Sequence, residues 1–242
     1  MASPGITPDG HLIPKHVAVV DHSSKISEVD IAFHVEALAI QMREHIAPLW
    51  DEEPPGIAFY GKADKIPPDQ AAVLAYVDSD GNADSAGYHA EIAGLVYGLI
   101  DVGQSRIPER TASHEFGEMY ANCRLTRKVM GPKNRLYYVE IMDPTQEQTY
   151  EIEVTLFGET RKIKVSDFVT PRWYGIKNTD PADPRMTYLG QPLRPFEAAP
   201  GGYQIAEEQD GEVVFLSAGA ARMNRSSHSR TRKIINQKFP RV

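Results

Sequence analysis

Cysteine is almost absent from this chain of 242 residues, which contains Cys123 alone. A single thiol excludes an intramolecular disulfide, so we expect a reducing compartment or a fold that needs no covalent cross-links. The chain also lacks an apolar run of about 18 residues, the length that a membrane-spanning helix needs, so no membrane partner is expected. Residues 1–10 lack the charged and then apolar segments of a signal peptide, and we therefore predict a cytoplasmic protein.

Positive charge is scarce over most of the chain. The formal net charge is −7, so the protein as a whole lacks the basic surface typical of nucleic-acid binding. Residues 222–242 differ, because they hold seven lysine and arginine residues and no acidic residue. We interpret this basic tail either as a solvated extension or as an arm that binds an acidic partner, such as a neighbouring subunit or packaged nucleic acid.

The order of apolar runs and turn residues predicts an α+β fold in which a mixed sheet packs on two main helices. The first helix begins at a capping box formed by Ser27 and Asp30 and ends near Ala47, before Pro48, and the second helix spans residues 108–124. A turn is expected at residues 80–82. Strands are predicted at residues 16–21, 57–60, 71–78, 95–102, 137–142 and 212–216, with a hairpin at residues 150–165.

The clearest chemical signal is the stretch SHEFGEM at residues 113–119. His114 and Glu118 are four residues apart, so on a helix both side chains lie on one face and can bind one cation. Glu115 occupies the position at which the general base of an H-E-x-x-H enzyme polarises a metal-bound water. Glutamate replaces the second histidine here. The alternative interpretation is that these residues form an exposed polar face of an ordinary helix.

A third metal ligand is predicted at Glu140, which follows Glu118 at about the spacing used by gluzincin-type sites. Asp143 could then orient one of the ligands through a hydrogen bond. The alternative is that Glu140 is a surface residue of a strand. Zn²⁺ is the expected metal. A ligand set of one histidine and two carboxylates is harder than a set of histidines, so Mn²⁺ or Fe²⁺ are the alternatives.

Residues 113–119 also resemble the Ser-His-Glu-x-x-Glu-Met helix of a family of uncharacterised bacterial and phage proteins described as metallopeptidases. Similar segments follow the order of that family along about residues 16–205, and the likeness implies a zincin-like fold without supplying a substrate. The chain departs from the family at Asn122-Cys123, where the family often has Asp-Pro, and at Met142, where it has cysteine. The similar segments are residues 41–50 (QMREHIAPLW), 87–89 (GYH), 140–144 (EIMDP), 165–174 (VSDFVTPRWY), 189–196 (LGQPLRPF) and 200–203 (PGGY).

With this resemblance, we expect four segments along the chain. Residues 1–15 form an N-terminal extension, and residues 16–173 form a zincin-like domain. Residues 174–221 form an irregular segment that wraps over the surface, because they are rich in Pro, Gly and Asp. Residues 222–242 form the basic tail.

Two further residues have alternative interpretations. His89 could line a substrate cleft, but we favour an ordinary loop histidine that hydrogen-bonds to the backbone. Cys123 could be a soft metal ligand, but we expect a small buried apolar residue.

Two functions are compatible with these features. The first is a metal-dependent hydrolase, most simply a peptidase that acts on a peptide or protein substrate, with Glu115 activating the water. The second is a structural or assembly component of a phage virion that keeps the zincin-like fold with little or no catalysis. In that case it would bind other virion proteins or its own copies through the basic tail and reside in the virion. The intact His114, Glu115 and Glu118 favour the first function, whereas the tail and the irregular segment favour the second.

Overall fold

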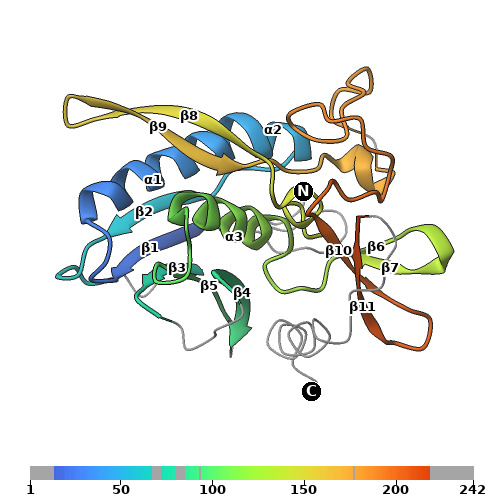
Figure 1. Ribbon diagram of the computed structural model, residues 1–242, viewed down its shortest axis with the longest axis horizontal. Coiled ribbons are helices and arrows are strands. Elements are labelled where there is room, and N and C mark those ends of the chain that lie inside the picture. The colour runs from blue at the N-terminus through green and yellow to red at the C-terminus, as the bar shows by residue number, and fades with distance from the viewer. Residues whose placement is uncertain (1–13, 67–71, 80–84, 93, 177, 219–242) are drawn as a thin grey trace.

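The computed structural model describes residues 14–66, 72–79, 85–92, 94–176 and 178–218. Its centre is a mixed five-stranded sheet in the order β2-β1-β3-β5-β4 (Figure 1). β1, β2, β3 and β5 are parallel, and β4 pairs antiparallel with β5 at the edge of the sheet. The predicted α+β class with a mixed sheet is therefore confirmed. The strands are β1 (His16–His22), β2 (Gly56–Tyr60), β3 (Ala72–Val77), β4 (Gly87–Ile92) and β5 (Leu95–Asp101).

β1 lies inside the sheet, between β2 and β3, and its middle residues are apolar. Val17, Val19 and Val20 are at most 3% exposed. Parallel strands covered on both faces have continuous apolar runs rather than alternating ones. This explains why the strand could be predicted from four consecutive apolar residues, 17–20, that show no polar alternation.

The first helix is α1 (Glu28–Ile40), and it begins where the capping box predicts. Ser27 Oγ accepts a hydrogen bond of 3.0 Å from the backbone N–H of Asp30, and the two side chains also bond to each other at 2.6 Å. These contacts satisfy one of the free N–H groups at the start of the helix.

The end of this first helical stretch was predicted three residues too early. A π-helical segment (Gln41–Ile46) follows α1 directly, and α2 (Ala47–Trp50) completes the turn. Pro48 lies in the first turn of α2, where its missing N–H would have no partner within the segment. The chain thus changes from α-helical to π-helical hydrogen bonding at Gln41 and returns to an α-helix at Ala47, so Pro48 lies at the start of a new helical segment.

The second helix, α3 (Pro108–Asn122), follows β5 and carries the metal motif. It is buried on all sides from Thr111 to Asn122, because different elements cover its opposite faces. On one face, Gly98 of β5 leaves room for the side chain of Met119. On another, the backbone N–H of Ser166 donates to Ser113 Oγ at 2.9 Å. A helix polar in sequence therefore occupies the middle of the molecule (Figure 1).

Ser166 ends a long hairpin of β8 (Thr149–Leu156) and β9 (Glu159–Ser166), as predicted for residues 150–165. The hairpin lies along α1 (Figure 1) and forms an apolar cluster separate from the main core. In that cluster Phe33 and Ala37 of α1 pack with Ile152, Val154, Ile163 and Val165 of the hairpin.

A second, antiparallel sheet has the order β11-β10-β7-β6. The predicted strand at residues 137–142 is shorter than expected, because the chain leaves β7 after Tyr138 and enters a 3₁₀ turn at Asp143–Thr145 that contains Pro144. Sequence periodicity missed β4, β6 and β10, of which β6 has only three residues. The strands of this sheet are β6 (Lys128–Met130), β7 (Leu136–Tyr138), β10 (Tyr203–Glu207) and β11 (Val213–Ser217).

Between Gly175 and Gly202 the described residues form no strand or helix, and one of them, Thr187, makes an isolated β-bridge with Val169. Met186, Tyr188 and Phe196 nevertheless pack against the main core, so this irregular segment is part of the folded body. The basic tail at residues 222–242, the turn at residues 80–82 and almost all of the N-terminal extension lie outside the described residues. Within the described ranges, no helix is long and apolar enough to cross a membrane.

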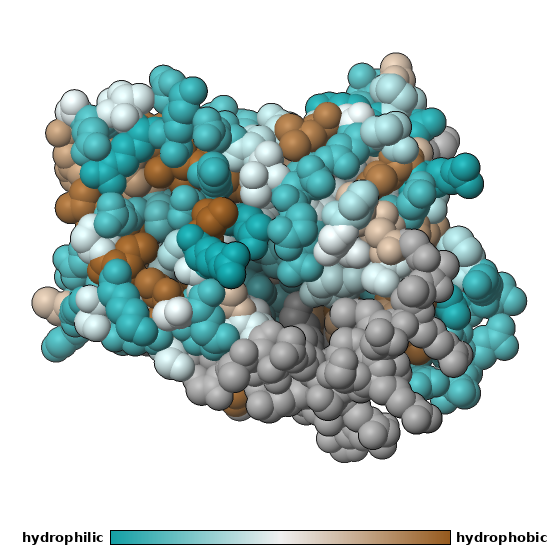
Figure 2. Space-filling model, viewed as in Figure 1, coloured by the Kyte–Doolittle hydropathy of each residue, from teal (hydrophilic) through white to brown (hydrophobic). Residues whose placement is uncertain are grey.

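The face shown in Figure 2 carries mostly hydrophilic side chains, with apolar side chains in small separate groups among them. The most exposed large apolar side chain among the described residues is Phe157, which is 77% exposed at the turn between β8 and β9. The buried charged side chains of α3 lie inside the molecule, below this surface.

Candidate metal centre

Six ionisable side chains meet beside α3, and all of them are at most 8% exposed. Three come from the helix itself, one from the edge strand β4, and two from the chain that follows β7. They are His114, Glu115 and Glu118 of α3, His89 of β4, and Glu140 and Asp143. The alternative interpretation of the motif as an exposed polar helix face is therefore wrong.

One triad is formed by His114, Glu118 and Asp143. His114 Nε2 lies 3.1 Å from Glu118 Oε1, one helical turn away, and 3.2 Å from Asp143 Oδ1. The ligand atoms of this triad lie within 4.8 Å of one another. His114 is the most exposed of the six side chains at 8%, so this triad is the part of the centre nearest to solvent.

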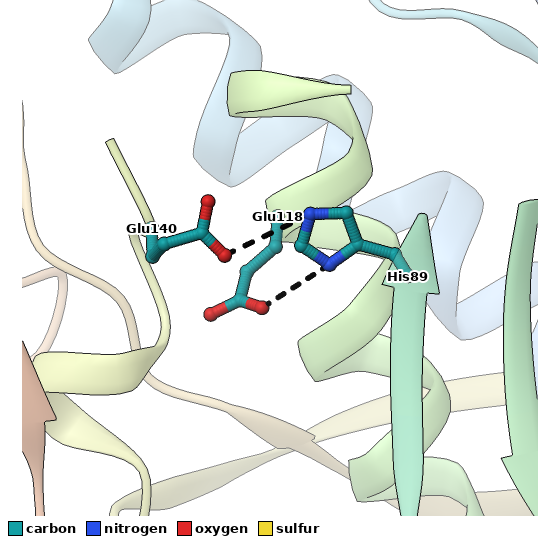
Figure 3. A group of neighbouring side chains, drawn as sticks. All are labelled: His89, Glu118 and Glu140. Atoms are coloured by element: carbon teal, nitrogen blue, oxygen red, sulfur yellow. Dashed lines mark ion pairs between the residues drawn. The ribbon is translucent and has the colours of Figure 1, made fainter. Parts of the chain in front are cut away.

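A second triad shares Glu118 and adds His89 and Glu140 (Figure 3). His89 points from β4 towards α3, with Nδ1 at 3.5 Å from Glu118 Oε2 and Nε2 at 3.7 Å from Glu140 Oε2. His89 Nδ1 also lies 3.4 Å from Glu115 Oε2. A single histidine on the edge strand thus faces all three glutamates of the centre.

The position of Glu140 depends on groups outside the two triads. Asn122, the last residue of α3, donates from Nδ2 to Glu140 Oε1 at 3.2 Å. The hydroxyl of Tyr174 donates to the backbone oxygen of Glu140 at 3.1 Å. Asn122 therefore connects the end of α3 to Glu140.

The start of the motif is held by a closed set of buried hydrogen bonds. Ser113 Oγ donates to Gln41 Oε1 at 2.8 Å and accepts from the backbone N–H of Ser166 at 2.9 Å. Gln41 Nε2 in turn donates to the backbone oxygen of Ser166 at 2.9 Å. The π-helical segment, α3 and β9 are therefore joined one residue before His114.

The charges of the centre are unbalanced. Glu115, Glu118, Glu140 and Asp143 are four buried carboxyl groups, whereas only two histidines face them. With all four carboxyl groups ionised, the six side chains would retain two negative charges even if both histidines were protonated. Burial lowers the pKa of His114, but the charge of Glu118 and the hydrogen bonds to Asp143 and Glu118 outweigh it and hold this pKa well above its usual range. Buried carboxylates with imidazole nitrogens are the donor set of a divalent cation such as Zn²⁺, Mn²⁺ or Fe²⁺.

The predicted ligands His114, Glu118 and Glu140 all lie in this centre, but they are divided between the two triads. Asp143, expected only to orient a ligand, lies as close to His114 as Glu118 does. The preferred interpretation of His89 as a loop histidine is wrong, because His89 is on β4 and fully buried. The signal that was missed is the segment GYHAEI at residues 87–92. It forms a short strand directly before the apolar strand β5 and so places His89 on the sheet.

Cys123, immediately after α3, is 2% exposed, and burial raises the pKa of its thiol to about 12. It does not belong to either triad, so the prediction of a small buried apolar residue is confirmed. No protein-family model, curated protein or solved structure matches the chain.

Proposed function

We propose that the protein is a metal-dependent hydrolase that cleaves peptide bonds, with divalent metal bound where the triad of His114, Glu118 and Asp143 meets that of His89, Glu118 and Glu140. The observation that carries this proposal is that four buried carboxyl groups and two imidazoles meet beside one helix, α3, which supplies three of them. Keeping so many like charges away from water is costly unless a cation compensates them. When bound, Zn²⁺ would supply Lewis-acid polarisation of the scissile carbonyl group.

Glu115 is the proposed general base. Its carboxylate lies beside the cation-binding residues without belonging to either triad, so it stays free to accept a proton from the attacking water. The same carboxyl group would then give that proton to the nitrogen of the leaving amine. His89 Nδ1 lies 3.4 Å from Glu115 Oε2, so the base is next to the second triad.

The fold supports the same proposal. In the family that the motif resembles, the metal helix belongs to a zincin-like domain with a neighbouring edge strand. Here α3 lies against β4, the antiparallel edge strand of the mixed sheet, and His89 spans the contact. The zincin-like fold and the peptidase activity are parts of this proposal, and Zn²⁺ is its preferred metal.

The test is Glu115→Gln, which keeps the size of the side chain and removes the base. The variant should keep its metal and its melting temperature but hydrolyse a peptide mixture roughly two to four orders of magnitude more slowly. Glu109→Gln is a matched control, because it makes the same change in the first turn of the same helix, outside both triads. Equal rates for wild type and Glu115→Gln would refute the proposed role of Glu115.

A structural role in virion assembly stays a prediction, because the basic tail on which it rests lies outside the described residues. A chain that binds metal but shows no hydrolysis dependent on Glu115 would favour that role.

A further inference from the structure

The two oxygens of Glu118 face different histidines. Oε1 lies 3.1 Å from His114 Nε2, whereas Oε2 lies 3.5 Å from His89 Nδ1. If Glu118 binds a single cation, that cation lies beside only one of the two histidines. A carboxylate that bridges two cations uses one oxygen for each.

The distances between donor atoms are compatible with cations. His114 Nε2 lies 3.1 and 3.2 Å from the two carboxylate oxygens of its triad. His89 faces its two triad carboxylates through different ring nitrogens, at 3.5 and 3.7 Å, and only one of these nitrogens can bind a cation shared with them. Ligand atoms about 2.1 Å from a tetrahedral metal are separated by about 3.4 Å, which is close to these distances.

The charge of the centre gives an independent argument. With both histidines neutral, as metal ligands must be, and all four carboxyl groups ionised, the centre would carry four negative charges. One divalent cation would leave half of this charge buried and uncompensated. Two divalent cations would neutralise the centre.

We propose that the centre binds two divalent cations bridged by Glu118. His114, Asp143 and Glu118 Oε1 hold the first, and His89, Glu140 and Glu118 Oε2 hold the second. This inference rests on the proposed metal centre and extends it, because a single cation was expected from the motif. It also accounts for the division of the predicted ligands, since His114 and Glu140 belong to different cation positions.

The experiment is a metal titration of the full-length chain after removal of metal with a chelator. Isothermal calorimetry and elemental analysis should give two Zn²⁺ ions per chain. Asp143→Asn and His89→Asn should each reduce this number to one, and Glu118→Gln should abolish tight binding at both positions. His22→Asn changes an exposed histidine at the end of β1 and should still bind two ions.

Mn²⁺ provides a second measurement that needs no variant. Two Mn²⁺ ions that share the Glu118 carboxylate are exchange-coupled, so the electron paramagnetic resonance spectrum of the loaded wild type should differ from that of isolated Mn²⁺. One ion per chain, or two ions with the spectrum of isolated Mn²⁺, would overturn the bridged pair. A chain that binds one ion leaves the proposed hydrolase intact, whereas a chain that binds none refutes both proposals.

Discussion

Ser113 donates a buried hydrogen bond of 2.8 Å to Gln41, and this contact fixes α3 to the π-helical segment one residue before His114. The two residues are far apart in sequence and have no role in either triad. They nevertheless hold the helix that carries three of the six centre residues against the π-helical segment. The geometry of the centre therefore depends on a polar contact in the core.

Ser113→Ala tests this dependence. The change leaves Gln41 Oε1 and the N–H of Ser166 without their partner, and a buried polar group without a partner costs about 1–3 kcal/mol. We expect a loss of unfolding free energy of that size, measured by urea denaturation of the metal-free protein. Thr155→Ala removes an exposed hydroxyl contact on the hairpin and should change stability by less than about 0.5 kcal/mol. Equal effects of the two changes would contradict this role for Ser113.

Removing the metal should destabilise the protein. A ligand present at 100 times its dissociation constant stabilises the folded state by about 2.7 kcal/mol, and a domain of this size shifts its melting temperature by about 2–4 °C per kcal/mol. Dialysis against a chelator should therefore lower the melting temperature by roughly 5–10 °C, and added Zn²⁺ should restore it. In Glu118→Gln the chelator should have almost no effect, since this residue belongs to both triads.

Gly117 of α3 packs against Met142. Met142 lies between Glu140 and Asp143 in the chain. A Cβ at residue 117 would overlap the end of the Met142 side chain and lie 3.3 Å from its Cγ, so Gly117→Ala must displace Met142. Overpacking of a buried site typically costs about 1–3 kcal/mol, which exceeds the gain of about 1 kcal/mol in helix propensity. We expect lower stability together with weaker Zn²⁺ binding, measured by calorimetry.

The double variant Gly117→Ala/Met142→Val is the matched control for this change. Its smaller side chain at residue 142 should recover most of the lost stability and metal affinity. If the double variant is no better than the single one, the contact with Met142 is not the cause.

Asp167 should make stability depend on pH. Burial raises the pKa of this carboxyl to about 6 in the folded protein, although the N–H of Leu189 donates to it. The unfolded value is about 3.9, so the stabilising contribution is complete below about pH 4 and is lost as the pH rises through about 6. Asp167→Asn should match wild type at pH 4 and be more stable by about 3 kcal/mol at pH 8.

Urea denaturation at the two pH values measures the difference for Asp167→Asn. Asp183→Asn should behave in the opposite way, because the ion pair with Arg185 lowers the pKa of Asp183 and stabilises its charged form. A gain at pH 8 in both variants would show that net charge, and not burial of Asp167, is responsible.

The parts of the fold that were predicted from sequence are those governed by local rules. The Ser27 cap, the turn at Gly158 and the apolar run of β1 each depend on neighbouring residues. The helical spacing of His114 and Glu118 likewise placed both on one face without any tertiary information.

The remainder depends on contacts distant in sequence. β4 was missed because an edge strand with the sequence GYHAEI has no clear alternation, and its pairing with β5 decides its conformation. His89 was misinterpreted for the same reason, because only the packing of β4 against α3 brings it to Glu118. The π-helical segment was unpredictable because Gln41 bonds to residues on two other elements.

The hairpin of β8 and β9 has a consequence for how the molecule opens. Its apolar side packs on α1 in a cluster separate from the main core, while its base is attached to α3 through Ser166. Amide hydrogens near Phe157 should therefore exchange with solvent through local fraying of the tip, whereas those near Ser166 should exchange only when the whole domain unfolds. The tip of the hairpin could then move without displacing its base, which stays bonded to α3 beside the candidate metal centre.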